Sequence, residues 1–163
     1  MSHKPAYHGG IVILVSFIVA FILTMIPVSD NLEIYRPHWL ILLLIYWCIA
    51  VPHRVGVFSG WLVGFFLDIH TDSLLGLHAL TFAIVAYLAY KLHARIRLYP
   101  LFQQSLIILL LVTLSQIILL WLNGITGNVR GDWSYWVSSL ISMLCWPWIF
   151  FLMRNIRRVY GVN

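Results

Sequence analysis

Asp68, His70 and Asp72 are the side chains whose types and spacing come closest to a chemical site. Carboxylate and imidazole groups bind divalent metal ions and transfer protons. Side chains at alternating positions converge on an extended segment but spread around a helix. The apolar run before Asp68 predicts a helix that ends near His70, so convergence is not expected. We therefore predict no metal site, no cofactor site and no catalytic residue here.

Short motifs that carry catalysis or nucleotide binding are absent from the chain. There is no H-E-x-x-H, C-x-x-C, P-loop, G-x-G-x-x-G or nucleophile-elbow pattern. Cys48 and Cys145 lie within apolar runs, where cysteine behaves as a small hydrophobic residue. The sequence is therefore not expected to encode an enzyme.

A stripe of small residues leads to Asp68. Gly56, Gly60 and Gly64 precede it at four-residue intervals, and each interval drifts by only about 40° around a helix. Small residues let helices approach closely in a membrane, so the stripe packs either inside this chain or against a partner. Asp68 is either a carboxylate at the aqueous helix end, bonded to nearby backbone N–H groups, or a polar anchor that fixes helices or a partner.

The composition indicates an integral membrane protein. Of the 163 residues, 62% are hydrophobic and only 9% are charged, whereas a soluble domain has about 25% charged residues. No long polar segment interrupts the chain, so one polytopic domain over 1–163 is expected. The formal net charge of +5 does not indicate nucleic acid, because the basic residues lie at membrane flanks.

Six apolar segments predict an all-α, six-helix transmembrane bundle. They cover about 11–27, 37–51, 55–70, 74–90, 101–122 and 133–153. A crossing needs about 20 residues, so the second and third segments either form short helices within the bundle or are partly re-entrant. Pro37 is expected in a first helical turn and Pro147 is expected to kink the last helix. Thr113, Ser115 and Gln116 in the fifth segment have side chains that could bond across helices.

The charged residues orient these segments. With six crossings, both termini and the loops at 52–54 and 91–100 share one side, which carries eight of the ten Lys and Arg residues. The opposite side carries all five acidic residues: Asp30, Glu33, Asp68, Asp72 and Asp132. Both termini are therefore predicted to be cytoplasmic. The basic stretches at 91–97 and 154–158 either contact anionic lipid headgroups or dock a cytoplasmic partner.

Several short patterns, taken together, resemble the rod shape-determining MreD family in its gammaproteobacterial form. The patterns are Gly60-x-x-x-Gly64-x-x-x-Asp68, Ser73-x-Leu75-Gly76, Ala86-Tyr87-Leu88, Arg36-Pro37-x-Trp39, Tyr46-Trp47, Pro52-His53-Arg54-Val55, Trp146-Pro147-Trp148-Ile149-Phe150 and Leu152-Met153-Arg154. Each is short, but their order and spacing cover essentially the whole chain.

The resemblance implies a non-catalytic elongasome component in the bacterial inner membrane. Such a protein binds MreC and acts with MreB, RodA and a penicillin-binding transpeptidase to control side-wall peptidoglycan synthesis and rod shape. Homo-oligomers of the chain within the complex are a further possibility. The residues expected to bind a partner or organise the bundle are Gly56, Gly60, Gly64, Asp68, Gly76, Arg36, Pro37, Trp39, Trp146 and Pro147.

The resemblance also supplies an alternative function. The family fold is thought to be similar to the substrate-binding component of energy-coupling-factor transporters, which implies vitamin or other small-molecule binding. That function requires a pocket near the outer face with convergent polar and aromatic groups. The candidate lining residues are Trp61, Asp68, His78, Trp133 and Trp136.

Overall fold

Helices form all of the secondary structure in residues 8–127 and 134–162, the parts of the chain that the computed structural model describes. The helices are α1 (His8–Met25), α2 (Asp30–Glu33), α3 (Trp39–Ala50), α4 (Val57–His70), α5 (Leu77–Ile96), α6 (Leu101–Ile125) and α7 (Ser134–Val159). Each of the six predicted segments coincides with one of the longer helices, and α2 is a single additional turn. The all-α prediction is confirmed.

The longer helices have the apolar character of membrane segments. Within the described residues, α5, α6 and the part of α7 from Trp136 are long and apolar enough to cross a bilayer. Helices α1, α3 and α4 are shorter but also apolar. The lengths and compositions therefore support a membrane protein.

Two of the predicted boundaries were wrong. The basic stretch 91–96, expected in a loop, forms the last turns of α5, and only residues 97–100 connect α5 to α6. Lys, Leu, Ala and Arg are good helix formers, and the helix stops shortly before Pro100, which disfavours helical backbone at the residue before it. Helix α3 begins at Trp39 with His38 as its N-cap, so Pro37 precedes the helix instead of occupying its first turn.

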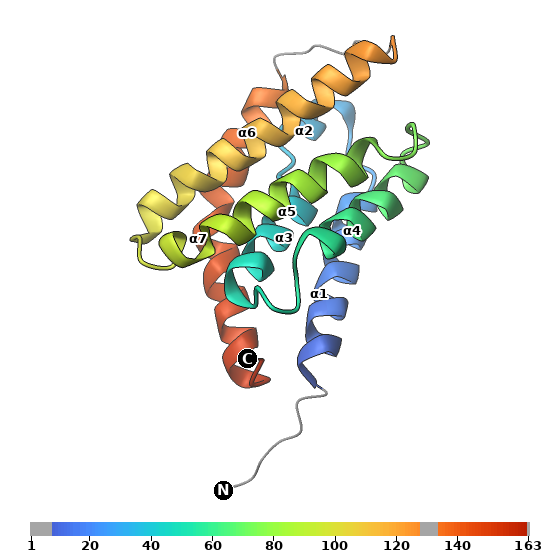
Figure 1. The fold of residues 1–163 in the computed structure, drawn as a ribbon. Helices are drawn as coiled ribbons and strands as arrows, with labels where there is room; N and C mark the ends of the chain where they lie inside the picture. The colour runs from blue at the N-terminus through green and yellow to red at the C-terminus, as the bar shows by residue number, and fades with distance from the viewer. Residues whose placement is uncertain (1–7, 128–133, 163) are drawn as a thin grey trace, which may run out of the picture.

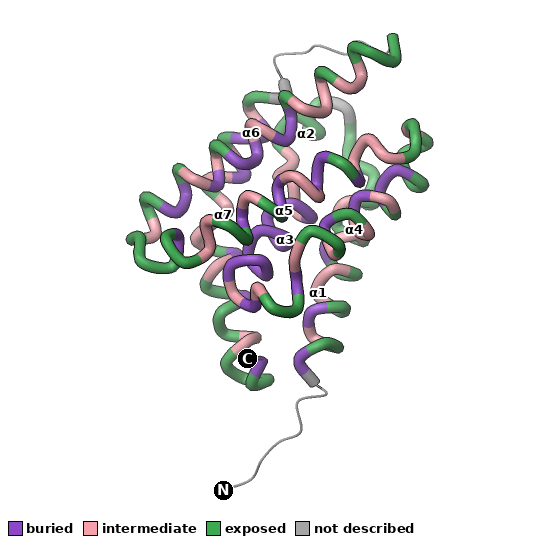
Figure 2. The backbone as a smooth tube through the Cα atoms, in the orientation of Figure 1, coloured by how far each residue is buried: buried purple, intermediate pink, exposed green. Residues whose placement is uncertain are grey.

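Helix α3 occupies the centre of the molecule. Every residue from Leu40 to Ile49 is buried, and α1, α5, α6 and α7 pack around it, as the purple tube in Figure 2 shows. A helix that is apolar on all sides belongs in an interior position. The indole Nε1 of Trp47 donates to Ser16 Oγ of α1 at 2.9 Å, which ties α3 to α1.

The remaining helices pair along the chain. Helices α4 and α5 form a closely packed hairpin, and α6 packs against α7. Figure 1 shows the α4–α5 loop, α2 and the end of α6 toward one end of the molecule. The turn at 51–56, the α5–α6 turn and the end of α7 lie toward the opposite end. Successive long helices therefore run in alternating directions.

Candidate functional site

The carboxylate of Asp68 joins the end of α4 to the start of α5. Its side chain is fully buried. It accepts hydrogen bonds from the backbone N–H groups of Gly76 at 2.9 Å, His78 at 2.9 Å and Ala79 at 3.2 Å. The first N–H groups of a helix have no partner within the helix, and negative charge is favourable there. Asp68 therefore caps α5 from the preceding helix.

Two side chains complete this cluster, which we call the Asp68 cap. Ser73 Oγ donates to Asp68 Oδ1 at 2.9 Å, and His78 Nδ1 lies 2.8 Å from the same oxygen. A carboxylate offers about four lone-pair sites, and five donors surround this one. Asp68 has no free site for a metal ion or a substrate proton. Both features that the sequence left as alternatives occur together: bonds to backbone N–H groups and a fixed helix junction.

The loop of the Asp68 cap requires unusual backbone geometry. Gly76 is the N-cap of α5 with φ 109°, a conformation that glycine adopts without a steric penalty. Asp72 has φ 47°, which Asp and Asn tolerate better than other non-glycine residues. His70 and Asp72 do not gather around Asp68, and the described residues contain no group of three or more potential metal ligands.

Gly60 and Gly64 face α5. A Cβ atom on Gly60 would lie 2.7 Å from Phe82 O, and one on Gly64 would lie 2.6 Å from Ala79 Cα. Real Cβ atoms do not approach backbone this closely, so both positions require glycine for the observed spacing. Gly56, the N-cap of α4, has no neighbour within 4 Å of such an atom. The stripe is thus occupied by α5 at two of its three glycines.

A second polar cluster, which we call the His38 cluster, ties the start of α3 to α6 and α7. Gln116 Nε2 lies 2.8 Å from His38 Nε2, and Ser139 Oγ donates to Gln116 Oε1. The backbone N–H of His38 donates to Ser142 Oγ at 3.0 Å, and Ser138 Oγ donates to the carbonyl oxygen of Arg36. The start of α3 is therefore held by side chains more than 75 residues away in the sequence.

Gln116 thus bonds between helices as predicted, whereas Ser115 bonds to Val112 O in its own helix. His38 and the α7 serines were not among the predicted site residues. A signal was present, because Ser138, Ser139 and Ser142 have the spacing of one helical face in an otherwise apolar segment.

The remaining predicted site residues lie at the edges of these clusters. Arg36 donates to Leu23 O at the end of α1, and Pro37 and Trp39 are half-buried on either side of His38. Trp146 is buried against Tyr46 and Phe150. Helix α7 continues through Pro147.

Among the candidate lining residues of a vitamin pocket, those that the structure describes do not converge. Asp68 and His78 bond to each other, whereas Trp61 stacks on Phe65 on the outer side of α4, with ring centroids 5.3 Å apart. Trp136 is exposed on α7, and Trp133 lies outside the described residues. A cavity of about 520 Å³ beside α3 and an apolar one of about 200 Å³ between α1, α3 and α4 are lined by other residues.

Comparison with known proteins covers nearly the whole chain. A family model described as rod shape-determining protein MreD matches residues 7–156. A relative from Haemophilus influenzae, named rod shape-determining protein MreD, is 33% identical over 146 residues, which is 90% of each sequence. No solved structure matches the chain. The matched range contains the Asp68 cap, both packed glycines and the His38 cluster.

Proposed function

The chain belongs to the rod shape-determining MreD family, and we propose that it is a non-catalytic inner-membrane component of the elongasome that binds MreC. Family membership supports its general role: it is an all-α membrane protein that takes part in determining rod shape. In the proposed complex it acts with MreB, RodA and a penicillin-binding transpeptidase to control side-wall peptidoglycan synthesis.

We also propose that the six long helices all cross the inner membrane, with both termini cytoplasmic. The alternating helix directions in Figure 1 support this arrangement. The end of the molecule with the 51–56 turn and the α5–α6 turn carries Arg54, Arg95 and Arg97, and α7 adds Arg154, Arg157 and Arg158 at its last turns. Basic residues concentrate on the cytoplasmic side of membrane proteins.

The observation that carries the proposal is the match over 90% of the chain to a named rod shape-determining protein. The site geometry fits a scaffold because its charged group is used internally. All five donors around Asp68 come from the α4–α5 junction. We propose that the α4–α5 hairpin, held by Gly60, Gly64 and the Asp68 cap, sets the shape of the surface that MreC recognises.

Complementation in a rod-shaped bacterium depleted of its own MreD tests the proposal. The wild-type chain is expected to restore rods and to co-purify with MreC. Gly64→Leu is expected to do neither, because the added side chain meets the α5 backbone. Gly124→Leu is the matched control, since a Cβ atom at Gly124 has open space around it.

Three outcomes would each contradict part of the proposal. Wild-type chain that is stably inserted but leaves the depleted cells round, and does not retain MreC, would exclude the elongasome role. Binding of a vitamin in a thermal-shift screen, together with dependence on an ATPase partner, would favour the transporter function. A Gly64→Leu variant with normal level, MreC binding and rod shape would show that the α4–α5 spacing does not control docking.

A further inference from the structure

A cavity of about 520 Å³ lies between α3, α6 and α7, next to the 51–56 turn and the α5–α6 turn. Its volume falls within the range of about 300–1,000 Å³ that is usual for small-ligand pockets. The polar lining residues include Arg97, Arg154, Arg157 and Gln104, and Tyr46, Trp146 and Phe150 form aromatic walls. None of these residues belongs to the Asp68 cap or to the His38 cluster, so the cavity is a separate feature of the fold.

Positive charge in this cavity is not balanced by the protein. Three arginines line it, and no Asp or Glu of the described ranges does. The ion pair found among the described residues, His78 with Asp68, lies at the opposite end of α5. A partly enclosed cluster of like charges is unfavourable unless anions approach it. The cavity is therefore suited to an anionic ligand.

Part of the arginine cluster has an internal role. Arg97 donates from Nε to Ile49 O and from a terminal nitrogen to Ala50 O, both at 2.7 Å, and Arg157 reaches Ala50 O at 3.4 Å. These bonds satisfy the carbonyl end of α3, where cations are favourable. A guanidinium has five N–H donors, so Arg97 and Arg157 keep donors to spare. Arg154 makes no hydrogen bond or ion pair with the described residues.

Two buried polar atoms of the lining residues are left without a partner. Trp146 is 1% exposed and Gln104 is 5% exposed. The indole N–H of Trp146 and the Oε1 atom of Gln104 have no hydrogen-bond partner among the described residues. The Gln104 amide is held in place because its Nε2 donates to Ile96 O and Tyr99 O. Buried polar groups without a partner are rare in proteins, and a water, an ion or a bound molecule commonly supplies the partner.

We propose that this cavity binds the headgroup of an anionic phospholipid with hydroxyl groups, as in phosphatidylglycerol. Arg154, the spare donors of Arg157 and the Trp146 N–H hydrogen-bond to the phosphate oxygens. A headgroup hydroxyl donates to Gln104 Oε1. The aromatic walls contact the glycerol backbone and the first methylene groups of the acyl chains. Basic pockets between membrane helices on the cytoplasmic side are known to take such headgroups.

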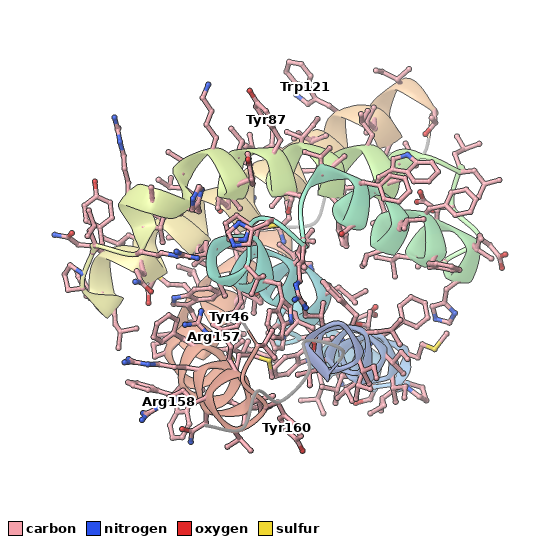
Figure 3. The ribbon with its side chains drawn as sticks, turned by 60° about the horizontal axis from the view of Figure 1, so that its bottom comes forward. Tyr46, Tyr87, Trp121, Arg157, Arg158 and Tyr160 are labelled. Atoms are coloured by element: carbon pink, nitrogen blue, oxygen red, sulfur yellow. The ribbon has the colours of Figure 1, made fainter. Side chains whose placement is uncertain are left out.

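The position of the arginines on α7 provides an internal control. Figure 3 shows Arg157 close to Tyr46, on the side of α7 that faces α3, whereas Arg158 lies on the outward side of α7. Arg158 does not line the cavity. The two residues are adjacent, carry the same charge and occupy the same helical turns. Substituting them separately distinguishes a built site from general attraction between basic residues and an anionic membrane.

The test uses the full chain, purified in a neutral detergent and delipidated. Binding of dioctanoyl phosphatidylglycerol, dioctanoyl phosphatidylcholine and inorganic phosphate is measured by tryptophan fluorescence and by native mass spectrometry. Saturable binding of phosphatidylglycerol is expected, at least about tenfold tighter than binding of phosphatidylcholine. Both lipids carry a phosphate, but the choline cation is repelled by the three arginines and has no hydroxyl to donate to Gln104 Oε1. This comparison requires no variant.

Variants locate the site. Arg154→Gln and Arg157→Gln are each expected to weaken phosphatidylglycerol binding about tenfold or more. Trp146→Phe keeps the ring but loses the N–H, and is expected to weaken binding about fivefold. Arg158→Gln is expected to change it less than twofold. Equal effects of Arg157→Gln and Arg158→Gln, equal binding of the two lipids, or saturation by inorganic phosphate without phosphatidylglycerol binding would each overturn the proposal.

Discussion

Replacing Asp68 with Asn keeps a polar side chain of similar size but exchanges one acceptor oxygen for an NH₂ donor and removes the negative charge. The variant should therefore show whether the fold needs the carboxylate itself. In the wild-type chain, Oδ2 accepts from the N–H groups of Gly76 and Ala79, and Oδ1 accepts from Ser73 Oγ and both nitrogens of His78 that face it. An amide nitrogen on the Oδ2 side would face two backbone donors. An amide nitrogen on the Oδ1 side would leave the backbone N–H of His78 without an acceptor.

The number of donors left without an acceptor sets the expected loss in the free energy of unfolding. One buried donor without a partner costs about 1–3 kcal/mol, so Asp68→Asn should lower the free energy of unfolding by at least about that amount. Asp68→Ala leaves three backbone N–H groups without an acceptor and should cost about 3 kcal/mol or more. Asp72→Asn is the matched control, because Asp72 is exposed and Asn also tolerates its φ of 47°. Its expected effect is within about 0.5 kcal/mol.

The assay is unfolding of the detergent-solubilised chain by sodium dodecyl sulfate, followed by tryptophan fluorescence and by helical circular dichroism. The order of stability should be wild type equal to Asp72→Asn, then Asp68→Asn, then Asp68→Ala. If Asp68→Asn and Asp72→Asn unfolded together with the wild type, the Asp68 cap would carry little of the stability of the α4–α5 junction.

Three further substitutions test other contacts in the same unfolding assay. Gly64→Ala should destabilise by about 1–3 kcal/mol because its Cβ atom meets the α5 backbone, whereas Gly124→Ala should be neutral or stabilising by about 0.5–1 kcal/mol; equal effects would contradict the close-packing assignment. Gln116→Leu should cost about 2–4 kcal/mol, since it removes a partner from each of two polar side chains, and a neutral result would mean that the cluster is not buried. Ser16→Ala should cost about 1–3 kcal/mol by leaving the Trp47 N–H unpaired, with a shifted tryptophan emission as the second readout.

Hydrophobic patterning carried the prediction of the helices. Each apolar run forms a helix. In lipid, the backbone N–H and C=O groups of an apolar segment find no outside partner, and a helix pairs them within the segment. Boundaries were less well predicted where charged residues continued the helix. Lys91 and Arg95 read as loop residues by polarity, but their long stems and good helix propensity extend α5 to Ile96.

The sequence indicated which residues make close or polar contacts, but not which helix or group each of them contacts. The spacing of Gly60 and Gly64 indicated a close approach of another helix, but spacing alone does not say which helix arrives, because that depends on the loop that follows. The Asp68 cap needs the turn through Gly76, which brings the start of α5 back to the carboxylate. Similarly, the N–H of Trp146 is buried without a partner only in the packed fold, so no pattern along the chain reveals it.

The shortness of α4 has a consequence for the surrounding membrane. Its 14 residues extend about 21 Å, whereas the hydrocarbon core of a bilayer is about 30 Å thick. Helix α4 packs mainly against α5, and its opposite side exposes Phe58 and Phe66. If α4 crosses the membrane as proposed, acyl chains beside it compress or tilt to match it, at a cost for every ångström of mismatch. A second protein whose own segment is equally short would relieve that compression by settling alongside, so bilayer thickness itself would favour assembly at this edge.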